Sequence, residues 1–416
     1  MQRLQRLQRG GGYNRAHAPT SPQPDRAPPS MNFYFVVALT VLNHIAYKGS
    51  KMLMALYAIE FGATPFQIGM LFALYAVFSL FIAIHVGRLS DRFGPRVLMM
   101  IGCAGLGGGL LLPFVWPRLG MLYVSVTLVG ALYIFFTVAS QHLIGAAGAG
   151  HNRTRNFGLY SIGIAMTALI APPLTGFAID HFGHQLTCAL LAALPVVPLV
   201  FLLFYRRGLA AEAKPAAAPP KHRAIDLLRN VPLRRALIAA GIIETGGELY
   251  SFYMPIYGHS LGLPASRIGL IMGVFAVAIL CARLVMPTLV RKTNEETVVA
   301  GSLALTAATC TLFPFVQDPV MLAAISFVFG LGLGCCGPLS MVLTYNRAPE
   351  GRAGEAIGWR QSFNKFIEVV CPLLFGTLAT AFGLSPAFWL NAVFLGGGAV
   401  LMRADAHALA QRKAAG

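Results

Sequence analysis

Apolar segments of about 20 residues follow one another along almost the whole chain, and they constrain its fold more than any other feature. A helix of that length can cross the hydrocarbon core of a bilayer, which is about 30 Å thick. Charged residues make up only 11% of the chain, against about 25% in a soluble domain. The sequence therefore predicts an all-α membrane protein with twelve transmembrane helices. The expected spans are 32–58, 66–86, 97–116, 119–147, 156–179, 186–205, 233–258, 266–288, 297–316, 319–345, 355–382 and 386–402.

Basic residues are unevenly spread over the segments between these spans. If the N-terminus is cytoplasmic, only Arg118 and Arg267 of the 32 Lys and Arg residues fall on the outer side, and most of the others lie in the tails and inner loops. Cytoplasmic loops of membrane proteins are enriched in Lys and Arg. We therefore expect a multi-pass protein of the cell membrane with both termini in the cytoplasm. The net charge of +17 follows from this topology and does not indicate a nucleic-acid partner.

Polar segments divide the chain into five parts. The N-terminal tail is basic and rich in Pro and Gly, and it lacks the apolar core of a cleavable signal peptide, so we expect it to be disordered. Met31 directly precedes the first span and is an alternative start of translation. The expected parts are a cytoplasmic tail (1–31), a six-helix bundle (32–205), a cytoplasmic Pro- and Ala-rich loop (206–232), a second six-helix bundle (233–403) and a cytoplasmic tail (404–416).

The two bundles resemble each other at a spacing of about 200 residues, which indicates a duplicated architecture. Two six-helix repeats of this kind are typical of transporters, in which the substrate site lies between the repeats near the bilayer midplane. The sequence therefore predicts two pseudo-symmetric halves of six helices each. The matching positions are Gly158, Pro172, Leu174, Gly176, Phe182 and Gly183 in the first half and Gly358, Pro372, Leu374, Gly376, Phe382 and Gly383 in the second, with Ile68-Gly69 matching Ile268-Gly269.

Residues 87–96, GRLSDRFGPR, resemble the signature between helices 2 and 3 of the major facilitator superfamily, roughly G-x-L-x-D-R-x-G-R-R. Pro95 stands where the first of the two closing basic residues is expected. In that family the glycine allows close helix packing, the aspartate contacts basic side chains and a helix N-terminus, and the basic residues hold the cytoplasmic gate. The resemblance implies a place in this gate for Gly87, Arg88, Asp91, Arg92, Gly94 and Arg96.

The resemblance covers residues 31–403 and implies a secondary transporter in which helices 1 and 7 line a central cavity. A second segment, APPLTGFAID at 171–180, partly resembles the helix 5 signature of drug/proton antiporters, with Ala171 in place of glycine. Gln141, however, occupies the place of the helix 4 arginine of many proton antiporters. This departure weakens a drug-efflux assignment.

Charged residues within the spans mark the expected working site. A charge inside a membrane is costly, so it is expected to face the bundle interior and to have a partner. His44, Lys48 and Lys51 fall at i, i+4 and i+7, on one face of the first helix. The repeat maps His44 onto Glu244 and Lys48 onto Glu248, so basic residues of the first helix would face acids of the seventh. The predicted pathway residues are Asn43, His44, Tyr47, Lys48, Lys51, Glu244, Glu248, Tyr250, Tyr253, Arg360, Gln361, Asn364, Lys365 and Glu368.

Two interpretations of this charge cluster compete. In the first, the charges are structural ion pairs, for example Lys48 with Glu248. In the second, basic groups bind an anionic or zwitterionic substrate while a carboxylate loads and releases a proton. We favour the second, with Glu248 and Glu244, then Glu368, as proton carriers and His44 as a further titrating group. Lys48 and Arg360 are the expected substrate-binding cations.

We therefore expect a transporter that moves a small polar or charged organic solute by alternating access, coupled to protons and active as a monomer in the lipid bilayer. The alternatives are an uncoupled facilitator and a transporter-like receptor or sensor. An enzyme is not expected, because no nucleophile has a base nearby and no cofactor motif is present. The seven cysteines lack C-x-x-C spacing and all fall within spans, so we expect neither disulfides nor a metal site.

Overall fold

A computed structural model describes residues 31–146, 151–204, 224–349 and 352–415, and within these ranges the chain is helical without any strand. The helices are α1 (Met31–Glu60), α2 (Pro65–Phe93), α3 (Pro95–Val115), α4 (Leu119–Ala146), α5 (His151–Phe204), α6 (Val231–Ser260), α7 (Ala265–Lys292), α8 (Glu295–Leu312), α9 (Pro319–Asn346), α10 (Ala353–Phe382) and α11 (Ser385–Ala415), with short 3₁₀ helices η1 (Ala224–Arg229) and η2 (Phe313–Phe315).

These elements supply the twelve predicted helices. Helix α5 contains two of them, because Gly183 interrupts it with a φ of 74°, a left-handed conformation that glycine adopts without steric cost. Within the described residues, nine helices are long and apolar enough to cross a membrane. Helices α1 and α6 are not among these nine, and each contains buried or partly buried charged residues in its middle. The two helices that fall outside the apolar set are therefore the charged helices that were expected to line a cavity.

Several helix boundaries differ from the expected spans. Helix α6 begins at Val231, inside the loop expected at 206–232, because Asn230 caps it by accepting a hydrogen bond from the Leu233 backbone N–H at 3.1 Å. Helix α11 continues to Ala415, so the C-terminal tail expected from residue 404 is helical. Here Asp405 holds the helix to its half, because its two carboxylate oxygens bind Arg235 at 2.6 Å and Arg347 at 2.7 Å.

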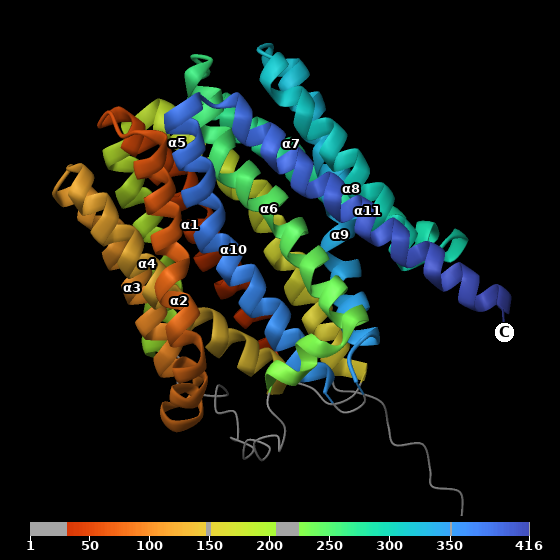
Figure 1. The fold of residues 1–416 in the computed structure, drawn as a ribbon. Coiled ribbons are helices and arrows are strands. Elements are labelled where there is room, and N and C mark those ends of the chain that lie inside the picture. The colour runs from red at the N-terminus through yellow and green to blue at the C-terminus, as the bar shows by residue number, and fades with distance from the viewer. Residues whose placement is uncertain (1–30, 147–150, 205–223, 350–351, 416) are drawn as a thin grey trace, which may run out of the picture.

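The two halves lie side by side in Figure 1, with α2, α3 and α4 at one edge and α8 and α11 at the other. Helix α10 belongs to the second half but packs beside α2 of the first, and α5 of the first half packs against α7 of the second. We call the end of the bundle where α1 ends and α2 begins the distal end. The α2–α10 and α5–α7 contacts are therefore the places where the halves meet.

Glycines allow these contacts to close. A side-chain carbon at Gly69 would collide with the carbonyl oxygen of Pro372, and one at Gly269 would collide with the carbonyl oxygen of Pro172. The two pairs are separated by 200 residues in each partner, as the sequence repeat predicts. Glycine at these positions lets the helix backbones approach closely.

Side chains cap the helix ends at the same two contacts. The carboxylate of Asp180 accepts hydrogen bonds from the backbone N–H groups of Ala265 at 3.0 Å and Ser266 at 2.9 Å, at the start of α7. The hydroxyl of Thr380 accepts one from the N–H of Phe66 at 3.0 Å, at the start of α2. We call the α5–α7 contact with Asp180 the acidic joint and the α2–α10 contact with Thr380 the neutral joint. Both lie at the distal end and hold the halves together there.

Candidate functional site

A cavity of about 340 Å³ lies between the halves, deep to the two joints. Helix α1 contributes to its wall from the first half, and α6 and α7 contribute from the second. Its apolar wall includes Met272 and Phe275 of α7 and Leu333 of α9. The polar and charged side chains in its lining are Lys48, Lys51, Glu244, Glu248, Tyr250, Ser251 and Arg283. The sequence predicted five of these seven as pathway residues.

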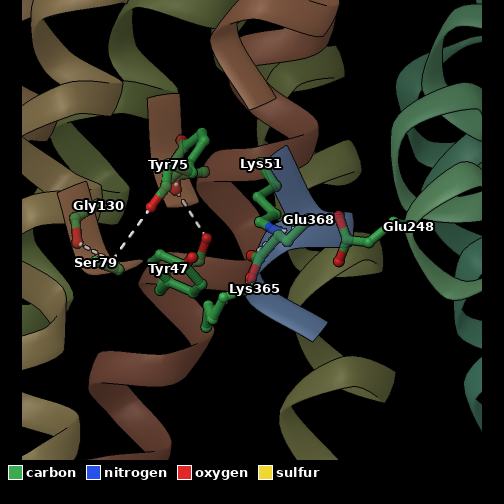
Figure 2. A network of polar contacts seen from close by, with 9 residues as sticks. Tyr47, Lys51, Tyr75, Ser79, Gly130, Glu248, Lys365 and Glu368 are labelled. Atoms are coloured by element: carbon green, nitrogen blue, oxygen red, sulfur yellow. Dashed lines mark hydrogen bonds and ion pairs between the residues drawn. The ribbon is translucent and has the colours of Figure 1, made fainter. Parts of the chain in front are cut away.

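Lys51 joins the two halves through Glu368 and Glu248 (Figure 2). Its Nζ lies 3.1 Å from Glu368 Oε1 on α10 and 3.7 Å from Glu248 Oε2 on α6. The Lys51 side chain is only 8% exposed. Since the lysine comes from the first half and both acids from the second, this ion-pair cluster crosses between the halves.

Glu368 is held by a second lysine. Its Oε2 accepts a hydrogen bond from Lys365, one turn earlier on the same helix, while its Oε1 accepts one from Lys51. Glu368 is buried, and a buried carboxylate is tolerated when it is paired and hydrogen-bonded. Two ammonium groups therefore balance this one carboxylate.

The two acids of α6 have fewer donors. Within the described part of the chain, Glu248 Oε2 is buried without a hydrogen-bond partner, and its nearest cation is Lys51. Glu244 Oε2 accepts a hydrogen bond from the Asn364 amide at 2.9 Å. The three acids of the cluster thus differ in how tightly the protein holds each as a carboxylate.

His44 lies apart from the acids, although its spacing places it on the same helix face as Lys48 and Lys51. Its ring hydrogen-bonds the hydroxyl of Tyr133 on α4, inside the first half. Tyr133 stacks on Tyr47 with ring centroids 3.9 Å apart. The structure therefore does not bring His44 into the lining of the cavity, because Tyr133 of α4 is its partner, and its part in the pathway stays a prediction.

Hydroxyl groups extend this network within the first half. Tyr75 on α2 donates to Ser50 Oγ at 2.9 Å, and Ser50 donates to the backbone carbonyl of Tyr47 at 2.8 Å. Ser79 donates to the carbonyl of Gly130 on α4 at 2.8 Å (Figure 2). The sequence gives no signal for Ser50, Tyr75 or Ser79, since isolated hydroxyls in apolar helices have no distinctive pattern. These contacts fix the helices that carry Tyr47 and Lys51.

Four other predicted residues do not join the ion-pair cluster. Arg360 donates to Ser340 Oγ at 3.3 and 3.2 Å and pairs with no described carboxylate. Gln361 is exposed, and it makes no hydrogen bond among the described residues. Asn43 and Tyr253 are fully buried, and neither lines the cavity. Tyr253 packs edge-on against Phe388, a contact within the second half.

Tyr250 lines the cavity as predicted. Its ring stacks on Phe275 with centroids 4.0 Å apart, and its hydroxyl donates to the carbonyl of Ile271 at 3.3 Å. Because the hydroxyl is engaged, Tyr250 offers the cavity an aromatic face.

Lys48 and Arg283 are the cationic residues of the described cavity lining that lie outside the cluster. The suggested pair of Lys48 with Glu248 is not formed; Glu248 pairs with Lys51, one turn further along α1. Neither Lys48 nor Arg283 makes an ion pair or hydrogen bond with any residue that the structure describes. The sequence leaves open whether Arg283, near the end of its predicted span, anchors the helix or takes part in the chemistry; α7 continues to Lys292, and Arg283 lines the cavity.

A second cavity of about 320 Å³ adjoins the first between α5 and α7. Lys48, Ala168, Ala276, Ile279 and Arg283 line both cavities. The remaining wall of the second cavity consists of Ser161, Ile164, Ala165 and Leu280. Apart from Ser161, these residues are apolar, so the second cavity is a mainly apolar extension of the first.

The predicted gate motif is only partly described. Arg96 donates from Nε to the carbonyl of Leu202 at 2.8 Å and from Nη2 to that of Leu203 at 3.1 Å, which ties α3 to the end of α5. Gly94 precedes α3 with a φ of 78°. The side chains at the other four motif positions, Gly87, Arg88, Asp91 and Arg92, lie outside the described ones.

Comparisons with known proteins agree on one family. A family model described as "Major Facilitator Superfamily" matches residues 36–367 and 295–415. The chain is 24% identical over 352 residues to "Multidrug resistance protein MdtG" of Klebsiella pneumoniae (strain 342), across 83% of this chain and 84% of the relative. It is also 24% identical over 381 residues to the protein of that name from Yersinia enterocolitica, across 88% and 92%.

Solved structures share the fold at low sequence identity. The nucleoside transporter NupG superposes with a TM-score of 0.79 at 13% identity, covering 89% of this chain and 99% of that one. A bacterial homolog of the human lysosomal transporter Spinster gives a TM-score of 0.74 at 12% identity, covering 91% and 98%. At such identities the likeness establishes the arrangement of helices and nothing about the cargo.

Proposed function

The chain belongs to the major facilitator superfamily, and on that premise we propose that it carries a small polar or charged organic solute across the cell membrane by proton-coupled alternating access. The observation that carries the proposal is Lys51 of the first half, bound to Glu368 and close to Glu248 of the second, at the wall of a cavity between the halves. Ionisable residues inside a membrane mark substrate and proton pathways.

The charge cluster can couple proton loading to movement of the halves. Glu248 is the proposed proton carrier, because its Oε2 lacks a described hydrogen-bond donor and its one ion pair among the described residues is with Lys51, at 3.7 Å. When Glu248 gains a proton, its attraction to Lys51 falls, and one tie between α1 and α6 is released. A ligand or proton shifts the equilibrium between two states by its different affinity for each. Glu244, bound by Asn364, is the proposed second carrier.

The proposed orientation follows from the Lys and Arg distribution. With both termini cytoplasmic, the distal end faces outward, and the two joints there close the outer side of the cavity. The described state is then one in which the solute is exchanged with the cytoplasm. Opening to the other side requires both joints to part.

An uncoupled facilitator is the second candidate, and one observation favours it. Lys51, Glu368 and Lys365 form a set of contacts that needs no proton to be complete. Such a set can hold α1 and α10 together as a structural ion pair through the whole transport cycle.

The relatives named for multidrug resistance suggest a third candidate, export of drugs. Gln141 at the usual place of the helix 4 arginine of proton antiporters weighs against the standard form of that mechanism. The cavity charges make a charged solute the more specific expectation.

A sequence of three measurements tests the proposal. A thermal-stability screen of purified protein against anions, cations and zwitterions selects a solute. Counterflow of that solute in proteoliposomes separates a transporter from a sensor, and uptake driven by an imposed pH gradient separates a coupled transporter from a facilitator. We expect Glu248→Gln to abolish pH-driven uptake while counterflow continues. Glu295→Gln, at the start of α8 and outside the cavity, serves as the matched control.

The proposed coupling at Glu248 would be refuted by pH-driven uptake that survives Glu248→Gln at the wild-type rate. A wild-type protein that shows counterflow but no response to the pH gradient would instead identify a facilitator.

A further inference from the structure

The cations that line the two cavities are divided into an engaged group and an unengaged group. Lys51 is bound to Glu368 and lies beside Glu248. Lys48 and Arg283 have no ion pair with any described residue. A cation in a membrane-embedded wall is expected to have a partner. These two side chains are therefore available to a ligand.

The lining of the first cavity carries three cations, Lys48, Lys51 and Arg283, against two acids, Glu244 and Glu248. Glu244 is hydrogen-bonded by the neutral amide of Asn364. Glu248 faces Lys51. The side of the wall shared by the two cavities carries Lys48 from α1 and Arg283 from α7 and no acid among the described residues.

The wall beyond these two cations is apolar. Ile164 and Ala168 of α5 and Ala276 and Leu280 of α7 line the second cavity. Sites for small molecules are mostly apolar concavities in which a few polar groups fix the orientation. A wall of this composition suits a hydrocarbon or aromatic body attached to an anionic head.

We infer that the two cavities form one site for an amphiphilic organic anion, with its acidic head held by Lys48 and Arg283 and its apolar body lying between α5 and α7. This inference rests on the proposed function and names the class of its solute. Arg can bind a carboxylate, sulfonate or phosphonate through two parallel N–H groups, and Lys adds a point charge. The same chemistry is offered by a free organic anion and by the head group of an anionic lipid.

Three ligands with one body and different heads test the class. 4-Phenylbutyrate, 4-phenylbutylamine and 4-phenylbutanol are titrated calorimetrically into the full chain in phosphatidylcholine nanodiscs, with empty nanodiscs subtracted. We expect the carboxylate to bind at least tenfold more tightly than the amine or the alcohol. We expect Lys48→Gln and Arg283→Gln each to weaken carboxylate binding about tenfold, the effect of losing one charge-assisted contact.

Matched variants show whether a loss comes from charge or from misfolding. Lys48→Arg and Arg283→Lys keep the charge and should retain most of the affinity. Arg291→Gln changes another arginine of α7, which lies outside both cavities, and should leave the affinity unchanged. Nanodiscs containing phosphatidylglycerol identify the source of the anion. Lower affinity there means that a lipid head group occupies the site, and unchanged affinity means that a free anion does.

The inference is overturned if the carboxylate does not bind, if the amine binds as tightly as the carboxylate, or if both Gln variants bind the carboxylate like the wild type. A failure of this inference can be told from a failure of the proposed function, because the binding measurement is made at equilibrium without a pH gradient, whereas the proposed function is tested by pH-driven uptake. Absence of carboxylate binding together with intact pH-driven uptake of another solute removes only the ligand class. Carboxylate binding without pH-driven transport removes only the coupling.

Discussion

Helix α10 and the first segment of α5 occupy equivalent places in the two halves, but their inward faces have opposite chemistry. Glu368 and Lys365 on α10 correspond through the 200-residue repeat to Ala168 and Ala165 on α5. Lys51, the partner of Glu368, corresponds to Ser251. On one side of the molecule, charged side chains therefore bridge the halves. On the other, small residues line the two cavities.

The comparison shows how a duplicated scaffold gains a site on only one side. The backbone contacts at the distal end keep the symmetry, with Gly69 on Pro372 matched by Gly269 on Pro172. Side chains deeper in the molecule break it, because an ion pair fills one side of the interface while small residues line cavities on the other. Helix packing thus conserves the geometry, and a few side chains decide where the cavity lies.

The largest expected effect comes from removing the charge that bridges the α10 side. Lys51→Met would leave Glu368 and Glu248 buried with less compensation, and loss of one partner of a buried ion pair costs about 3–5 kcal/mol. Thermal unfolding in detergent should show a large destabilisation, and transport should be lost. Ser251→Ala, at the equivalent position on α6, is the control and should cost far less. Equal effects of the two substitutions would contradict the asymmetry.

A smaller effect is expected from crowding either distal contact. Gly69→Leu and Gly269→Leu each place a side chain against a backbone carbonyl, and overpacking of this kind costs about 1–3 kcal/mol. Because the obstacle is steric and symmetric, both variants should oppose closure of the distal end to a similar degree. Accessibility of a cysteine introduced there to a membrane-impermeant thiol reagent measures the closure.

Gly108→Leu on α3 is the matched control, since a Cβ added there has no other atom within 4 Å. If only one of Gly69→Leu and Gly269→Leu increased labelling of the introduced cysteine, the distal contacts would not be equivalent.

The smallest effect separates the acidic joint from the neutral joint. Asp180→Ala and Thr380→Val each remove a side chain that caps a helix of the opposite half, which costs about 1 kcal/mol. The acidic joint also places a negative charge at the positive end of α7, an attraction that salt screens. We therefore expect the cysteine labelling of Thr380→Val to respond to added salt, as the wild type does, and that of Asp180→Ala to respond less. Identical salt responses would remove the distinction.

Much of this fold could be predicted from the sequence. Hydropathy indicates the membrane spans, and the matching Gly and Pro positions indicate the repeat. The sequence also placed Lys48, Lys51, Glu244 and Glu248 in one cavity, since charges in a span must face the interior. It could not decide which lysine meets Glu248. Lys48 and Lys51 are one turn apart on α1, and the choice depends on the rotation of that helix against α6 and α10.

Two placements could not be predicted from the sequence. His44 shares a helix face with the lysines by spacing, but Tyr133 on α4 supplies its hydrogen-bond partner, and no sequence pattern links residues on α1 and α4. Arg283 lies near the end of the span predicted to stop at 288, whereas α7 runs four residues further and Arg283 lines both cavities.

The position of the two joints at the same end of the molecule also constrains how it moves. Both joints connect one half with the other, and each half is tied internally by its own helix contacts. A rigid rotation that parts one joint therefore strains the other, and the pair should release together. Fluorescence energy transfer between dyes on the distal tips of single molecules would then jump between two levels, with no long-lived half-parted species.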